Sequence, residues 1–160
     1  MNSTDIELTN DRGYQTIGLR FRHVNIPRSA VVKKAFIQFQ SDEVSSGIAY
    51  LVIRAEHLAD SPRFFPFRHD LSNRKLSPLV VSWSPQPWTS ANTSGPDQQT
   101  SDISSLIQTI IDLPAWKQGN ALSIIISGVG NRVAESFDGD PDAAPFLFVE
   151  YLDSDKTFKR

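Results

Sequence analysis

The feature that most constrains this chain is a repeated alternation of apolar and polar residues in short segments. In residues 17–21, the apolar Ile17, Leu19 and Phe21 alternate with small or charged residues. A period of two is typical of a β-strand with one buried face, because successive side chains of a strand point to opposite sides. Similar segments, each bounded by Gly, Pro, Asn or Asp, occur at residues 35–39, 49–57, 79–83, 121–127, 132–137 and 145–151. The alternation therefore predicts about seven strands.

One segment follows a helical period instead. After Asp102, a residue type that favours helix N-caps, Ile and Leu recur at a spacing of three or four, and Pro114 prevents the helix from continuing. Many strands with a single helix favour an antiparallel arrangement, because an alternating βαβ architecture requires several helices. We predict an all-β fold, a jelly-roll-like antiparallel β-sandwich with one short amphipathic helix.

Length and composition are consistent with a single domain. The chain has 160 residues, of which 39% are hydrophobic, and this is sufficient for one sizeable core. We predict one β-sandwich domain over residues 1–152 and a disordered polar tail over residues 153–160. Two long segments rich in turn-forming residues, 59–75 and 84–101, are predicted to be loops that carry functional groups.

Charge and hydropathy argue against several classes of partner. The net charge of −2 provides no broad attraction to nucleic acid or to an anionic membrane, and no run of about 18 apolar residues could span a bilayer. The absence of cysteine excludes disulfides and thiolate metal sites. The first residues lack the basic and apolar regions of a secretory signal, so we expect that the signal of a secreted protein would lie upstream.

A carboxylate-rich segment near the end of the chain predicts a calcium site. Asp138 and Asp140 flank a glycine, and Glu135 precedes them by three positions. Ca²⁺ takes about six to eight oxygen ligands, and a glycine between two of them allows the backbone to turn sharply. Asp42 and Glu43, which follow the second predicted strand, could add further oxygens. The alternative is an ordinary Asx turn, which Asp-Gly and Asp-Pro pairs form readily.

A second candidate site is basic and polar. The outward registers of three predicted strands carry Arg20, Arg22, Gln38, Gln40, Arg54 and Glu56, all of which are expected to face solvent. If these strands are neighbours, the side chains form a patch that can bind carboxylates or sulfates through forked hydrogen bonds. The alternative is a charged solvent face with ordinary surface ion pairs.

Aromatic residues in the two loops are candidates for stacking on sugar rings. Trp88 and Phe65, with Arg68 beside the latter, lie outside the predicted strands, whereas Trp83 and Trp116 are expected in the core. The alternative for the loop aromatics is that they close one end of the sandwich.

The sequence does not favour catalysis. The three histidines are scattered, and neither a metal-binding histidine pair nor a serine nucleophile elbow is present. The sequence does not exclude a pair of carboxylates for glycoside hydrolysis, such as Glu56 with Glu135, because spacing along the chain does not give the distance between the two side chains. We predict that the chain is not an enzyme.

The order of these segments resembles that of DNRLRE-type jelly-roll domains, and the resemblance covers most of residues 5–152. Such domains open with a strand ending in Leu-Arg-Phe, an Ile-Pro turn and a second apolar strand, then continue with a polar-capped helix and closing strands. The similar segments here are residues 17–21, 24–27, 35–39, 101–108, 119–122 and 145–151.

The resemblance implies a function. Domains of this family occur in secreted, multidomain bacterial proteins, and some bind acidic polysaccharides. It therefore implies a non-catalytic, extracellular carbohydrate-binding module, monomeric and part of a larger protein, with an acidic polysaccharide favoured by the arginines. The alternative is a structural or adhesive spacer domain without a sugar ligand.

Overall fold

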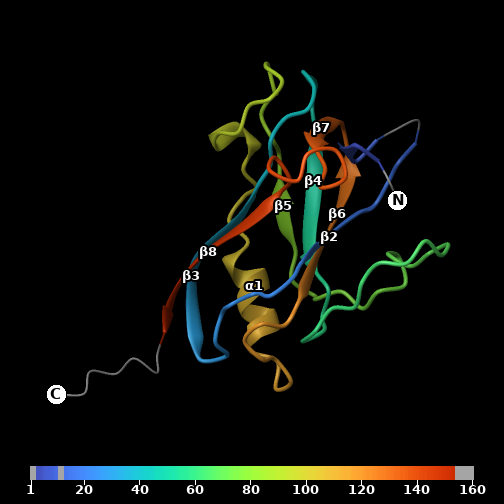
Figure 1. Ribbon diagram of the computed structural model, residues 1–160. Coiled ribbons are helices and arrows are strands. Elements are labelled where there is room, and N and C mark those ends of the chain that lie inside the picture. The colour runs from blue at the N-terminus through green and yellow to red at the C-terminus, as the bar shows by residue number, and fades with distance from the viewer. Residues whose placement is uncertain (1–2, 11–12, 154–160) are drawn as a thin grey trace.

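Antiparallel strands and one α-helix make up the computed structural model, which describes residues 3–10 and 13–153 (Figure 1). Every predicted strand segment contains a strand, and the predicted helix is present, so the all-β class is confirmed. The elements are β1 (Asp5–Leu8), β2 (Ile17–Phe21), β3 (Ala30–Gln38), β4 (Tyr50–Ala55), β5 (Val81–Trp83), the 3₁₀-helix η1 (Pro96–Gln98), α1 (Ser104–Ile111), β6 (Leu122–Val129), β7 (Arg132–Glu135) and β8 (Phe146–Asp153).

Strand β1 was not expected, because its four residues alternate two carboxylates with two apolar residues and are too few to form a clear pattern. The boundary of the predicted tail is also corrected, since Asp153 is the last residue of β8. The rest of that tail, residues 154–160, lies outside the described residues.

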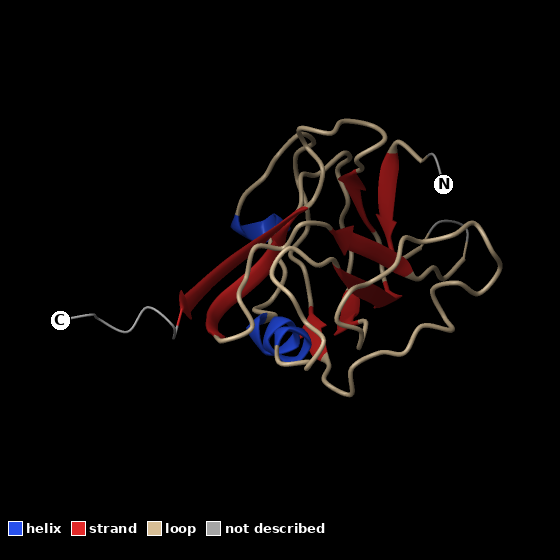
Figure 2. Ribbon diagram, turned by 60° about the horizontal axis from the view of Figure 1, so that its bottom comes forward, coloured by secondary structure: helices blue, strands red, loops and turns tan. Residues whose placement is uncertain are grey.

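The strands form two layers (Figure 2). One layer is a four-stranded antiparallel sheet in the order β2-β6-β4-β5. The other combines the pairs β3-β8 and β1-β7, which are joined by hydrogen bonds between residues 40–42, the continuation of β3, and Val133 and Glu135 of β7. Side chains from both layers meet in one core, among them Ala35, Ile37, Leu51, Ile53, Ile124 and Ile126. The arrangement is therefore sandwich-like.

The core contains the residues that the alternation assigned to it. Ile37, Phe39, Leu51 and Ile53 are buried, as are Trp83 and Trp116. Ile17, Leu19 and Phe21 pack against this core but are only partly buried, because β2 is an edge strand of its sheet.

Helix α1 packs against β3 and β4 at one end of the two layers (Figure 1). Its buried side chains are Leu106, Ile107, Ile110 and Ile111. The N-cap is Ile103, one residue after the predicted Asp102. Among the described residues, no helix has the length and apolar character needed to cross a membrane.

The Asp102 carboxylate connects the start of α1 to β3. It accepts hydrogen bonds from the N–H groups of Ser104 and Ala35, at 2.8 and 3.1 Å. Burial alone would raise the pKa of Asp102, but these hydrogen bonds outweigh it and the pKa is lowered. The N-cap prediction was therefore off by one residue, but the Asp102 carboxylate still bonds to the first residue of the helix and also to β3.

Candidate functional site

Two of the predicted ligand arginines share the outer face of the four-stranded sheet. Arg20 lies opposite Ser123 of β6, and Arg54 lies opposite Ile125 of the same strand. Strand β6 therefore separates β2 from β4, and the two arginines are on either side of it. Arg22 is exposed and follows directly after the end of β2.

The predicted outward position of Gln38 is wrong. Gln38 belongs to β3, in the other layer, and is buried. Its side-chain amide donates to the carbonyl oxygens of Phe39 and Gly95, and its side-chain oxygen accepts a hydrogen bond from Gln99. The 94–99 segment covers the face that the alternation assigned to solvent, so Gln38 holds this segment on the sheet and is not available to a surface ligand.

Trp88 is also not a surface residue. It is fully buried, and its indole N–H donates to the carbonyl of Asp97 at 2.9 Å. Its ring lies 6.4 Å from the ring of Phe39, centroid to centroid. Trp88 is therefore part of the core and does not present its ring to a ligand.

The 59–75 loop keeps its aromatic residues at or near the surface. Phe65 is partly buried and stacks on Phe67 with 5.7 Å between ring centroids, and the guanidinium of Arg63 lies 4.8 Å from the Phe65 ring. Phe67 and Arg68 are exposed. Phe65 is thus held between two neighbours within the loop, which leaves little of its ring for a ligand.

An open groove of about 990 Å³ runs along β2 and brings together residues from distant parts of the chain. Its walls come from β1, β2, the 59–75 loop and the 136–145 segment. Arg20, Arg22 and His23 line it on the β2 side, and the aromatic rings of Phe64 and Phe137 line it elsewhere. The carboxylates at its margin are Asp5, Glu7 and Asp138.

The contact between β2 and the loop wall of this groove depends on Gly18. A Cβ atom at this position would lie 2.7 Å from Cζ of Phe64 and 2.7 Å from Cδ2 of Leu71, which is closer than real contacts allow. The glycine therefore lets the loop approach the strand. A glycine inside a strand often marks such a close approach, and this signal in the sequence could have located the groove.

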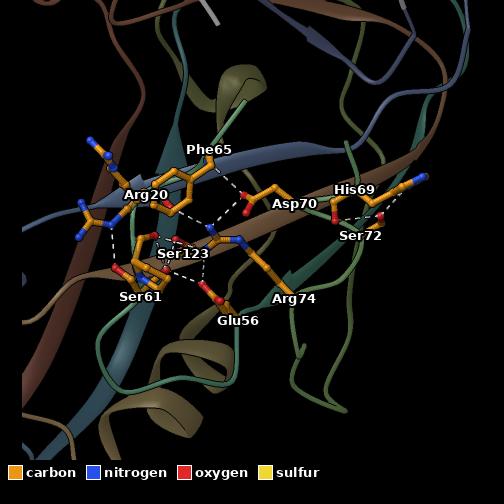
Figure 3. A network of polar contacts seen from close by, with 11 residues as sticks. Arg20, Glu56, Ser61, Phe65, His69, Asp70, Ser72, Arg74 and Ser123 are labelled. Atoms are coloured by element: carbon orange, nitrogen blue, oxygen red, sulfur yellow. Dashed lines mark hydrogen bonds and ion pairs between the residues drawn. The ribbon is translucent and has the colours of Figure 1, made fainter. Parts of the chain in front are cut away.

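A buried polar network holds the loop that forms one wall of the groove (Figure 3). The guanidinium of Arg74 binds the Glu56 carboxylate at 2.9 Å and the Asp70 carboxylate at 3.0 Å. Ser61 donates to Glu56 and also contacts Ser123 of β6. The prediction that Glu56 faces solvent is wrong, because its side chain is buried under the loop and neutralised by Arg74.

This network also orients Arg20. Its Nε donates to the carbonyl of Ser61 at 2.8 Å (Figure 3). No other bond of Arg20 is found within residues 3–10 and 13–153, so both terminal nitrogens remain for a ligand. A guanidinium fixed at Nε presents its two terminal N–H groups as a fork, the geometry that binds carboxylates and sulfates.

The predicted calcium ligands are only partly gathered. Burial raises the pKa of Glu135, and a hydrogen bond with Asp42 and the charges of Asp42, Asp140 and Asp5 raise it further. Asp138 lies at the groove, and Glu43 is exposed. Among the described residues, no three His, Asp or Glu side chains are arranged to hold a metal ion.

The acidic loop has the hydrogen bonds of a turn. The Asp140 side chain accepts the N–H of Asp142 at 3.0 Å, and the Ser136 hydroxyl accepts the N–H of Gly139 at 3.1 Å. The Ser136 hydroxyl donates in turn to the carbonyl of Ser3 at 2.7 Å. These bonds form the Asx turn expected as the alternative, and they attach the loop to the residues before β1.

No family model matches the chain, and no curated protein is similar to it. The candidate site therefore rests on the geometry of the groove.

Proposed function

We propose that the chain is a non-catalytic module that binds an acidic polysaccharide in the groove along β2, as part of a larger secreted bacterial protein. Membership of the DNRLRE-type jelly-roll domains belongs to the same proposal and rests on the sequence resemblance. The observation that carries the proposal is the placement of Arg20 and Arg22 in one open groove with the rings of Phe64 and Phe137.

The groove has the features that a chain of charged sugars requires. It is open and follows a strand, so an extended polymer can lie in it without its ends being enclosed. Arg20 is fixed at Nε and offers two donors to a carboxylate or sulfate, while an exposed Phe137 offers an apolar face to a sugar ring. The carboxylates of Asp5 and Asp138 at the margin would accept hydrogen bonds from sugar hydroxyls.

The test is retention of the protein on alginate and on sulfated gels. Wild type should be retarded, and the Arg20→Gln, Arg22→Gln double variant should lose most of the retardation together with its dependence on salt. A matched control, Arg28→Gln with Lys117→Gln, removes the same charge from exposed positions outside the groove. Equal loss in the control variant would mean that net charge, and not the groove, causes retention.

A variant at Arg54 distinguishes between two possible binding surfaces, the groove and the outer face of the sheet. It shares the outer face with Arg20 but does not line the groove. Arg54→Gln should therefore leave retention close to that of wild type. If Arg54→Gln alone abolishes retention, the ligand lies across the sheet.

A structural or adhesive spacer without a sugar ligand is the second candidate. Two of the predicted ligand residues, Gln38 and Trp88, are buried and serve the fold, which is what a spacer domain predicts. Failure of wild type to bind any acidic gel would favour this candidate.

Calcium is a separate proposal, motivated by the closeness of Glu135 to Asp42 and Asp140. An ion that binds only the native state should stabilise it by about 2.7 kcal/mol at a hundredfold excess over the dissociation constant. Melting temperature should then rise with Ca²⁺ and fall with a chelator, and the Asp138→Asn, Asp140→Asn variant should lose the response. Melting that is insensitive to Ca²⁺ and to chelator would leave the loop as a turn.

A further inference from the structure

Strand β8 has one hydrogen-bonding edge that meets no other strand. Among the described residues, it pairs only with β3, along Ala30 to Gln38 (Figure 1). On the far side of β3, both backbone groups of Ala35 and Ile37 bond to residues 100–103. Since bonding alternates along an antiparallel strand, the intervening residues of β3 are the ones that bond to β8.

The register then identifies which groups of β8 are unused. Lys34, Phe36 and Gln38 of β3 lie opposite Glu150, Phe148 and Phe146. The backbone groups of the alternate residues, Leu147, Val149 and Tyr151, therefore point away from β3. Within residues 3–10 and 13–153, no partner is found for their N–H groups.

This edge differs from the other edges of the fold. Strands β5, β1 and β2 have three, four and five residues, whereas β8 has eight. Short edge strands, prolines and lysines normally prevent an edge from pairing with another chain. β8 contains neither proline nor lysine. The register between β3 and β8 shifts once, at a bulge that lies in β3.

The outer face of β8 is also apolar. Phe146, Phe148 and Leu152 are 55%, 38% and 59% exposed, and Phe148 stacks on Phe36 of β3 at 4.8 Å. Glu150 is the one charged residue among them and lies opposite Lys34. A long edge with unused N–H groups and exposed apolar residues beside it is suited to adding a further strand.

We propose that β8 pairs antiparallel with β8 of a second copy of this chain, about a two-fold axis at Val149. In this register Val149 lies opposite Val149 of the second copy, and Leu147 lies opposite Tyr151. All three residues with unused backbone groups then form bonded pairs. On the outer face, Phe148 lies opposite Glu150 and Phe146 opposite Leu152 of the second copy.

Among the symmetric registers in which two copies of β8 could pair, the residue types favour the one with its axis at Val149. An axis at Glu150 would place two carboxylates directly opposite each other, which is unfavourable. An axis at Phe148 would place Tyr151 opposite Pro145, which has no N–H to donate. The axis at Val149 avoids both, and it gives the self-complementary patch that a two-fold dimer requires. The dimer replaces the monomer expected from the sequence and does not depend on the polysaccharide groove.

The first test is the mass of the protein by sedimentation equilibrium over a wide range of concentrations. Wild type should approach twice the monomer mass. Val149→Pro removes an N–H that the folded monomer does not use, so the variant should fold and remain monomeric. Phe146→Lys with Leu152→Lys should also be monomeric, while the control Val44→Lys with Ile48→Lys, which alters exposed apolar residues away from β8, should dimerise like wild type.

The second test fixes the register, and it is simple because the chain has no cysteine. A mixture of the Phe148→Cys and Glu150→Cys variants should form a disulfide-linked dimer on mild oxidation. Leu152→Cys alone should not, since six residues along paired strands separate the two copies of this position by about 20 Å. Wild type that stays monomeric at every concentration would overturn the proposal, and so would a dimer that persists in both β8 variants.

Discussion

The side chains of Arg74 and Arg132 are both largely buried, but each is held by different partners. Arg74 binds the carboxylates of Glu56 and Asp70, and it also donates to the carbonyls of Pro62 and Arg63 at 3.2 and 2.9 Å. It attaches the 59–75 loop to the outer face of the four-stranded sheet (Figure 3). The charge of Arg74 is therefore balanced by opposite charges.

The bonds of Arg132 all go to backbone oxygens. Its guanidinium is fully buried and donates to the carbonyls of Gln86, Asn131, Gly47 and Pro85, at 2.9, 2.6, 2.9 and 2.9 Å. It thereby joins β7 to the segment after β5 and to the turn before β4. Burial lowers the pKa of Arg132 from its ordinary value, because the charged form loses its hydration.

The difference shows two ways of stabilising a buried cation. An ion pair leaves an uncompensated charge when one partner is removed, whereas a ring of carbonyls leaves only unsatisfied dipoles. Loss of the cation should therefore cost more in the first case than in the second. Substitution of each arginine tests this difference.

The largest effect is expected from Arg74→Met. Removal of the cation leaves the buried Glu56 carboxylate without its partner, which should lower the free energy of unfolding by about 3–5 kcal/mol at neutral pH. Urea denaturation measures this loss. Replacement of Glu56 by Gln in the same variant should narrow the gap to wild type, because the neutral amide no longer carries the unpaired charge.

Arg63→Met is the matched control for that variant. Arg63 lies in the same loop and is exposed, with its guanidinium against the Phe65 ring. Its substitution should change stability by no more than about 0.5 kcal/mol. A loss of similar size in both variants would mean that the ion pair contributes little and that the loop simply loses packing.

A smaller loss, about 1–3 kcal/mol, is expected for Arg132→Met. Gly47 and Gln86 are exposed residues, so water can reach part of the vacated site and bond to their carbonyls. The loss should be constant between about pH 4 and 8, because no titrating partner is involved. A loss as large as that of Arg74→Met would refute the distinction between the two sites.

The strands and the helix could be predicted from the sequence because their signals are local. The alternation at Ile37 and Phe39 identifies a strand and its buried face without knowledge of its neighbours. It also predicted that Gln38 faces solvent. This prediction is wrong because the 94–99 segment, distant in sequence, covers that face. Local periodicity cannot show which outer face is covered by a loop.

The site was predictable only in part for the same reason. Arg20 and Arg22 were identified from their outward register, and both line the groove. The contacts of Phe64 and Leu71 with Gly18 of β2 were missed, because the position of their loop depends on the bonds of Arg74, which lies outside any regular element. Both buried arginines were missed as structural residues, since the sequence carries no mark of the partners that surround them.

Glu135 extends the comparison to a partly buried carboxylate whose neighbours carry charges of the same sign. The carboxylates of Asp42, Asp140 and Asp5 surround it, and the pKa of Glu135 is raised from an ordinary value of 4.5, first by burial and then by Asp42. The folded state therefore holds this proton more tightly than the unfolded chain does. The stabilisation is complete below pH 4.5, where both states are protonated, and is lost as pH rises through the higher value of the folded state.

Glu135→Gln should remove this pH dependence, because the amide is neutral at every pH and its N–H can still donate to Asp42. Above the pKa of folded Glu135, the variant should be more stable than wild type. The change in the free energy of unfolding should be smaller than for Arg74→Met or Arg132→Met. Thermal melts between pH 4 and 8 measure this, and Glu43→Gln, at an exposed carboxylate, is the control. If the melting temperature of Glu135→Gln falls with rising pH as steeply as that of wild type, another group causes the pH dependence. The like charges around Glu135 are then already screened by solvent.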